Sequence, residues 1–92
     1  MPYNPKAIAN YFLTMANDRK ELLSPMKLQK LVYFANGWYL ALKGEPLIDE
    51  QVEAWKFGPV IPSLYAEFQR FGDQPITEKA ELVVTEIDGW KT

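Results

Sequence analysis

The first hydrophobic residues of the chain recur at the spacing of an α-helix. Asn4 precedes Pro5, and an N-cap residue followed by proline at the first helical position is a typical helix start. The hydrophobic residues that follow lie on one side of such a helix: Ile8, Tyr11, Phe12 and Met15. The pattern predicts a helix from Pro5 to about Asn17 and Asp18, with this stripe facing the core.

A longer helix is predicted between Ser24 and Gly44. Ser24-Pro25 repeats the start signal, and glycine is the residue most often found just past a helix end. Hydrophobic residues between them share one face: Leu28, Leu31, Val32, Ala35, Trp38, Tyr39 and Leu42. We expect this helix to lie in the centre of the domain and these residues to hold its core.

The other side of the long helix is also hydrophobic. Tyr33, Phe34 and Leu40 fall outside the main stripe. Gly37 lies on the same side, where it costs about 1 kcal/mol relative to alanine. A glycine there permits close approach of another backbone. Either internal packing or contact with a partner protein would explain a glycine at position 37.

A short β-hairpin is predicted after Gly44. Residues 45–50 have the composition of a turn with a short strand-like piece, and residues 51–57 alternate in the manner of a strand. Gly58-Pro59 is expected to form a rigid turn after that strand. Trp55 and Phe57 would share one strand face. They either complete the core or form an aromatic contact surface of the kind that anchors protein interfaces.

A third helix is predicted from Pro62 to Gly72. Its hydrophobic residues again lie on one side: Leu64, Tyr65, Phe68 and Phe71. Residues 73–92 are ambiguous, because residues 81–87 suit a strand whereas Thr77 suits the cap of a short helix. The fold class is therefore mainly α (α+β): a compact three-helix domain with a central long helix and a short β-hairpin.

The composition limits the possible chemistry. The 92 residues include neither cysteine nor histidine, which excludes disulfides, thiol nucleophiles, Cys/His zinc sites and histidine-based triads. Neither a signal peptide nor a membrane span is recognisable, so we expect a cytoplasmic protein. We also expect neither a cofactor nor a metal. A hydrolase would need a convergent pair of carboxylates in a pocket.

The charge is unevenly distributed, although the net charge is only −2. Residues 1–46 carry six Lys/Arg against three Asp/Glu, and residues 47–92 carry four against nine. Three lysines of the long helix have two tyrosines between them, a combination that suits nucleic acid: Lys27, Lys30, Tyr33, Tyr39 and Lys43. A nucleic-acid-binding regulator of winged-helix type is therefore the alternative function, and its binding would weaken steeply with salt.

Three linked motifs resemble a known family. The segment LQKLVYFANGWYL (residues 28–40), the triplet Glu53-Ala54-Trp55 and the turn Gly58-Pro59-Val60 with Tyr65 beyond it are similar to the Panacea domain of SocA-like antitoxins, which is common in phages, prophages and toxin–antitoxin pairs. The resemblance is strongest over residues 26–72. It implies a mainly helical, non-enzymatic protein that neutralises a toxin encoded nearby, by direct binding or by presenting it for degradation.

Members of this family usually continue beyond the third helix. The chain is therefore expected to be a single Panacea-like domain over residues 1–92, either a short member or a C-terminally truncated one. A missing helix would expose apolar surface and favour homo-oligomers or an obligate partner.

The resemblance and the residue pattern together give one hypothesis for the binding surface. The long helix and the hairpin are expected to bind the cognate toxin through Lys27, Lys30, Tyr33, Gly37, Trp55, Phe57, Gly58 and Pro59.

Overall fold

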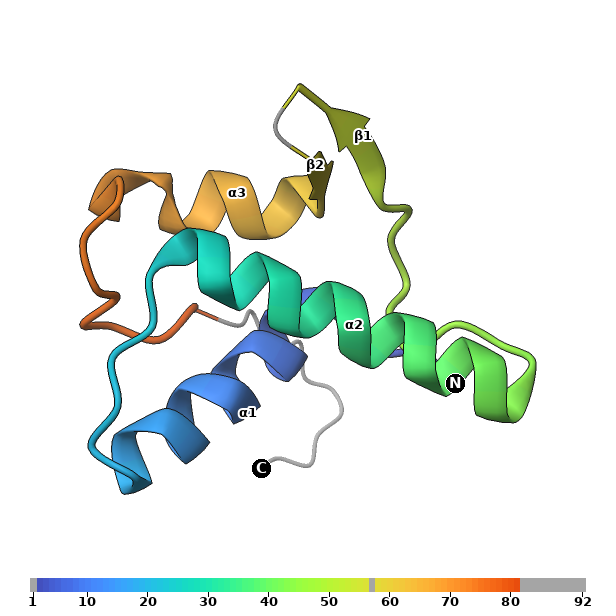
Figure 1. The fold of residues 1–92 in the computed structure, drawn as a ribbon, viewed down its shortest axis with the longest axis horizontal. Helices are drawn as coiled ribbons and strands as arrows, with labels where there is room; N and C mark the ends of the chain where they lie inside the picture. Colours follow the sequence, from blue (N-terminus) through green and yellow to red (C-terminus); the bar gives the residue numbers. More distant parts are fainter. Residues whose placement is uncertain (1, 57, 82–92) are drawn as a thin grey trace.

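The computed structural model describes residues 2–56 and 58–81, which form three helices and a two-stranded hairpin (Figure 1). In chain order the elements are α1 (Pro5–Asp18), α2 (Pro25–Lys43), β1 (Glu53–Trp55), β2 (Gly58–Val60), α3 (Pro62–Phe68) and the 3-10 turn η1 (Gln69–Phe71). In Figure 1, α2 runs between α1 on one side and α3 with the hairpin on the other. The expected fold class, mainly α with a short hairpin, is confirmed.

The ends of the first two helices lie where the sequence predicts them. The Asn4 side chain accepts a hydrogen bond from the Lys6 N–H at 2.9 Å, and the Ser24 hydroxyl accepts one from the Lys27 N–H at 3.3 Å. Gly44 ends α2 in the left-handed conformation with φ of 76°, and its N–H donates to the Leu40 carbonyl. These contacts satisfy backbone groups that a helix end leaves without an intrahelical partner.

The third helix begins with a contact from a distant part of the chain. Its N-cap, Ile61, has no side chain that can cap a helix. The Glu50 carboxylate instead accepts a hydrogen bond from the Ser63 N–H at 2.9 Å. A negative charge is favourable at this end of a helix. The loop before β1 thus helps to fix the start of α3.

The hairpin differs from the predicted one. The pairing is antiparallel, with Glu53 opposite Val60, Ala54 opposite Pro59 and Trp55 opposite Gly58. Gly58 and Pro59 therefore belong to the second strand, and the prediction that they form the turn was wrong. Each strand of a two-stranded sheet is an edge strand, where proline is tolerated because its missing N–H interrupts no ladder to a further strand.

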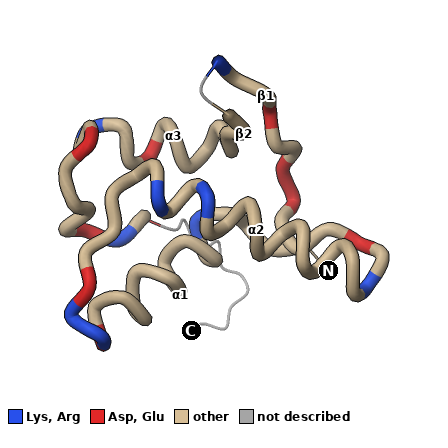
Figure 2. The backbone as a smooth tube through the Cα atoms, in the orientation of Figure 1, with Lys and Arg blue, Asp and Glu red and all other residues tan. Residues whose placement is uncertain are grey.

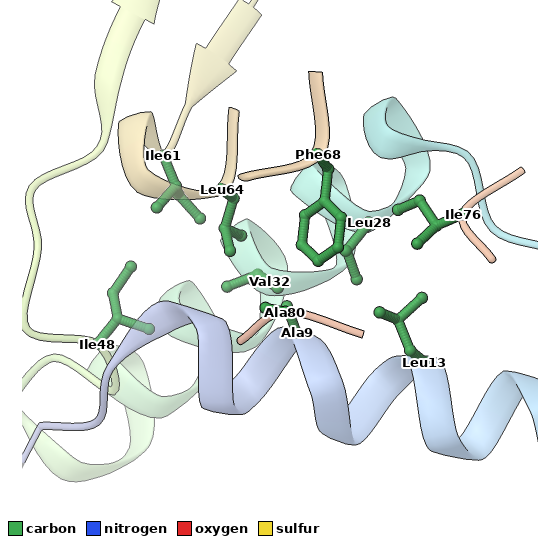
Figure 3. Packing of buried hydrophobic residues seen from close by; sticks show 10 residues of the cluster. All are labelled: Ala9, Leu13, Leu28, Val32, Ile48, Ile61, Leu64, Phe68, Ile76 and Ala80. Carbon is green, nitrogen blue, oxygen red and sulfur yellow. The ribbon is translucent and has the colours of Figure 1, made fainter. Parts of the chain in front are cut away.

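A hydrophobic core lies between the three helices. Phe68 of α3 lies among side chains from α1, α2 and α3 (Figure 3). The cluster also includes two residues of the irregular segment after η1. Its buried members are Ala9, Leu13, Leu28, Val32, Ile48, Ile61, Leu64, Phe68, Ile76 and Ala80.

The inward face of α1 is rotated from the predicted stripe. Its buried residues include Ala9, Leu13 and Ala16, whereas Tyr11 of the predicted stripe is 62% exposed. Ile8 and Phe12 are half-buried at the edge of the core. Alanine brings helix backbones closer together than a large side chain permits. The pattern of large hydrophobic residues therefore indicated the helix correctly but misplaced its buried face.

The predicted core face of α2 is correct only in its first half. Leu28 and Val32 are buried, but Trp38 and Leu42 are 68% and 70% exposed. By length, the 19 residues of α2 span about 28 Å, whereas α1 and α3, of 14 and 7 residues, span about 21 and 10 Å. The last turns of α2 extend past the elements that would cover them.

Side-chain amides fasten two irregular segments to the helices. Asn36 Oδ1 accepts hydrogen bonds from the Leu47 and Ile48 N–H groups at 2.8 and 3.2 Å. Asn10 both donates to the Ala80 carbonyl at 3.0 Å and accepts from the Ala80 N–H at 2.8 Å. Buried backbone groups outside helices and sheets need such partners.

The segment after η1 has no helix within the residues described. Residues 73–81 are irregular, so the prediction of a short helix capped by Thr77 was wrong there. Ile76 is buried, and its N–H donates to the Leu23 carbonyl. Apart from Glu81, the strand predicted over residues 81–87 lies outside the described residues.

Candidate protein-binding surface

An apolar groove lies between the start of α2 and the hairpin with α3. It has a volume of about 560 Å³. Six of the eleven residues that line it are apolar or aromatic: Pro25, Met26, Trp55, Pro59, Val60 and Tyr65. The other five are Gln29, Lys30, Lys56, Gln69 and Gly72. This volume suits a few side chains of a ligand rather than a flat interface.

One glutamine of α2 ties the two walls of the groove together. Gln29 Oε1 accepts a hydrogen bond from the Ile61 N–H at 2.9 Å, and Gln29 Nε2 donates to the Ile61 carbonyl at 3.1 Å. Ile61 lies between β2 and α3 and is itself buried. The first half of α2 is thereby held at a fixed place relative to the opposite wall.

An aromatic pair forms part of that opposite wall. The Trp55 and Tyr65 rings meet edge to face with centroids 5.0 Å apart. The Trp55 indole N–H also donates to Glu53 Oε1 at 2.9 Å. Trp55 is nevertheless 42% exposed and absent from the core cluster, so the alternative that it completes the core was wrong.

The groove has a positive rim. Lys30 and Lys56 belong to its lining, and no carboxylate does among the residues described. Helix α2 carries three lysines and neither Asp nor Glu. Figure 2 shows Lys or Arg in the first half of α2 and at the tip of the hairpin.

A shallower depression, of about 870 Å³, lies beside the second half of α2. Tyr33, Gly37 and Leu40 line one side of it, and the loop of residues 46–52 lines the other. A Cβ built on Gly37 would meet no atom within 4 Å. Within the described chain, Gly37 therefore makes no close internal contact that would require a glycine.

The depression contains two carboxylates. Asp49 and Glu50 both line it, but Glu50 is engaged at the start of α3 through the Ser63 N–H. Glu50 therefore has a structural role, because it fixes the start of α3.

The groove and the depression adjoin along one face of α2. Among the α2 residues that line them, five follow helical spacing on a single face, namely Met26, Lys30, Tyr33, Gly37 and Leu40. We call this face the α2 stripe. Its members are separated by four or three positions.

The structure distributes the eight predicted binding residues over this surface. Three of them line the groove: Lys30, Trp55 and Pro59. Tyr33 and Gly37 line the depression. Lys27 is exposed in the first turn of α2, and Gly58 pairs with Trp55 in the hairpin. Phe57 lies outside the described residues.

Some residues of this surface were not predicted from the sequence. Gln29, Met26 and Tyr65 line the groove although none was a candidate. The residues one helical turn before and after Gln29 are apolar or aromatic, namely Pro25, Met26, Val32 and Tyr33, and a polar side chain among them was an available signal. No comparable local signal marks Met26 or Tyr65, because their exposure depends on where α3 packs.

No helix within residues 2–56 and 58–81 combines the length and the hydrophobicity needed to span a bilayer.

Comparison with known families agrees with the motifs and the fold. Residues 28–88 match the model of the family described as "Antitoxin SocA-like, Panacea domain". The match includes most of α2, the hairpin and α3, so the chain belongs to the SocA-like Panacea family and the resemblance seen in the sequence is confirmed.

One curated relative is Antitoxin SocA of Caulobacter vibrioides (strain NA1000 / CB15N), which is 44% identical to this chain over 75 residues. The alignment covers 82% of this chain and 40% of the relative, so the chain spans well under half of that protein's length. No solved structure matches the chain significantly.

Proposed function

We propose that this protein is an antitoxin-type binding module that neutralises a cognate toxin protein by direct contact. The contact surface is the groove together with the α2 stripe, and it contains Lys30, Tyr33, Gly37, Trp55 and Pro59. Lys27, Phe57 and Gly58 are proposed as further contact residues. Presentation of the toxin for degradation is compatible with the same surface. The proposal requires no catalytic group, cofactor or metal, and it places the protein in the cytoplasm with its toxin.

The observation that carries this proposal is the groove held by Gln29 within a chain of the SocA-like family. The walls are fixed by hydrogen bonds, and the lining contains an exposed tryptophan and tyrosine. Tryptophan, tyrosine and positively charged side chains dominate the energetics of protein interfaces. A fixed groove also avoids part of the ordering cost of binding.

Co-expression tests the proposed function. The reading frame next to this one is expressed alone and together with this chain, and growth is recorded. Restored growth together with co-purification of the two proteins supports direct binding. Restored growth with loss of the toxin from immunoblots indicates degradation instead. If no neighbouring product is toxic, or toxicity persists on co-expression, the antitoxin proposal is wrong.

Replacement of Trp55 by alanine is expected to weaken the toxin complex about tenfold or more, because a large aromatic anchor leaves the groove. The Kd is measured by isothermal titration calorimetry. Tyr11→Ala is the matched control, because Tyr11 is also an exposed aromatic residue but lies on α1, away from the groove. Equal losses for the two variants would contradict a specific role of Trp55.

Replacement of Gly37 by leucine tests the α2 stripe separately. A Cβ at this exposed position meets no atom within 4 Å, so the far-UV circular dichroism is expected to be unchanged. Toxin affinity is expected to fall about tenfold, because the side chain projects into the contact surface. Gly37→Ala is the control and should bind within a few-fold of the original while favouring the helix. Unchanged binding by the leucine variant would remove Gly37 from the surface.

The nucleic-acid alternative has no supporting observation among the residues described. The lysines of α2 lie at its two ends, with Lys27 and Lys30 near the start and Lys43 in the last turn. The hairpin carries one carboxylate, Glu53, and one lysine, Lys56, so its described residues add no net positive charge.

A further inference from the structure

The groove has a chemistry that selects among possible partner segments. Its walls are apolar and aromatic, and its rim is positive. We infer that it binds a short apolar segment of the partner protein that is flanked by carboxylates. This inference rests on the proposed function and specifies which part of a toxin the groove would recognise.

The shape of the groove argues for a short segment. A volume of about 560 Å³ lies within the range of pockets that enclose small ligands. It accommodates a few apolar side chains between the Trp55–Tyr65 pair and Met26 of the α2 stripe. Because Gln29 bonds both polar groups of Ile61, the space is formed before any partner arrives.

Charge complementarity argues for acidic flanks. Lys30 lies on the α2 wall and Lys56 at the hairpin wall, so positive groups stand on both sides of the apolar floor. A segment with Asp or Glu on either side of its apolar residues would meet Lys on both walls. A basic segment would be repelled at the same two places.

Two synthetic peptides test this inference without knowledge of the toxin. Both contain the same central leucine and tryptophan residues; one has aspartates at its two ends and the other has lysines. Each is titrated into the ¹⁵N-labelled chain, and backbone amide shifts are followed by NMR. We expect the aspartate peptide to bind about tenfold more tightly at low salt and to shift the amides around Gln29, Lys30 and Trp55.

A charge reversal provides the matched variant. Lys30→Glu places a carboxylate on the α2 wall, and we expect it to reverse or abolish the preference between the two peptides. Lys43→Glu is the control: it changes the net charge equally but lies in the last turn of α2, outside the groove lining, and should keep the preference. Equal responses of the two variants would reduce the effect to net charge and overturn the inference.

The remaining outcomes are equally decisive. Absence of binding, equal binding of the two peptides, or shifts centred on other residues would overturn the inference, while the growth assay would still test the proposed function. A peptide of residues 81–92, which is itself apolar and acidic in sequence, is included. If the groove binds that peptide in preference to the other two, residues 81–92 of this chain are its ligand and the inference is overturned. If the amide shifts of the groove residues change with protein concentration in the absence of peptide, a second copy of this chain occupies the groove and the inference is overturned.

Discussion

Replacing Phe68 by alanine is expected to lower the free energy of unfolding by about 3–5 kcal/mol, the usual loss for a buried phenylalanine. Phe68 is 1% exposed and lies at the meeting point of the three helices (Figure 3). Removal of its ring would leave a cavity in the core cluster that also contains Leu28, Leu64 and Ile76. Small domains are stable by only about 5–15 kcal/mol, so this single change removes a large share of the total.

Urea denaturation followed by circular dichroism measures this loss. Phe34→Ala is the matched control, because the same ring is removed from a site that is 60% exposed. Exposed substitutions away from special contacts change stability by about 0.5 kcal/mol at most. If both variants lost the same stability, the core would not be centred on Phe68.

Replacing Asn36 by alanine is expected to cost about 2–3 kcal/mol, since two partly buried N–H groups would lose their acceptor. Alanine is the better helix former, so helix propensity cannot explain a loss. The Leu47 and Ile48 N–H groups would be affected, and Ile48 is part of the core. The loop that forms one side of the depression should loosen with them.

Thermal unfolding measures this second effect, and a loss of this size corresponds to a decrease of about 10 °C or more in Tm for a domain of this length. Asn36→Asp retains an oxygen that can accept both hydrogen bonds and is expected to lose much less stability at neutral pH. An aspartate variant as unstable as the alanine variant would show that the oxygen acceptor is not what matters at this position.

The helix limits could be predicted from the sequence because their signals are local. The pairs Asn4-Pro5 and Ser24-Pro25 place a capping side chain next to a proline, and both begin helices as predicted. Gly44 ends α2 for a reason that is equally local: its backbone adopts the left-handed conformation. Neither signal depends on the rest of the chain.

The buried faces depended on distant packing and were predicted less well. Trp38 and Leu42 continue the apolar periodicity of α2, yet the neighbouring helices are too short to cover them. Ala9 contributes little to a hydrophobic pattern, yet it is fully buried against the core. Periodicity identifies a helix, but the length and position of its neighbours decide which residues become buried.

The candidate site could likewise be predicted only where its residues stand out locally in the sequence. Lys30, Trp55 and Pro59 were predicted as binding residues and line one groove. The hydrogen bonds that form this groove join Gln29 and Ile61, which are 32 positions apart in the sequence. Nothing in either segment alone indicates that pairing.

The buried first half of α2 and its exposed last turns are under different constraints. Leu28 and Val32 are constrained by folding, because they are buried. Phe34, Trp38 and Leu42 are largely solvent-exposed, so substitutions there have little effect on the core. These three positions are therefore able to diverge in evolution while Asn36, one turn away, and the buried scaffold are kept.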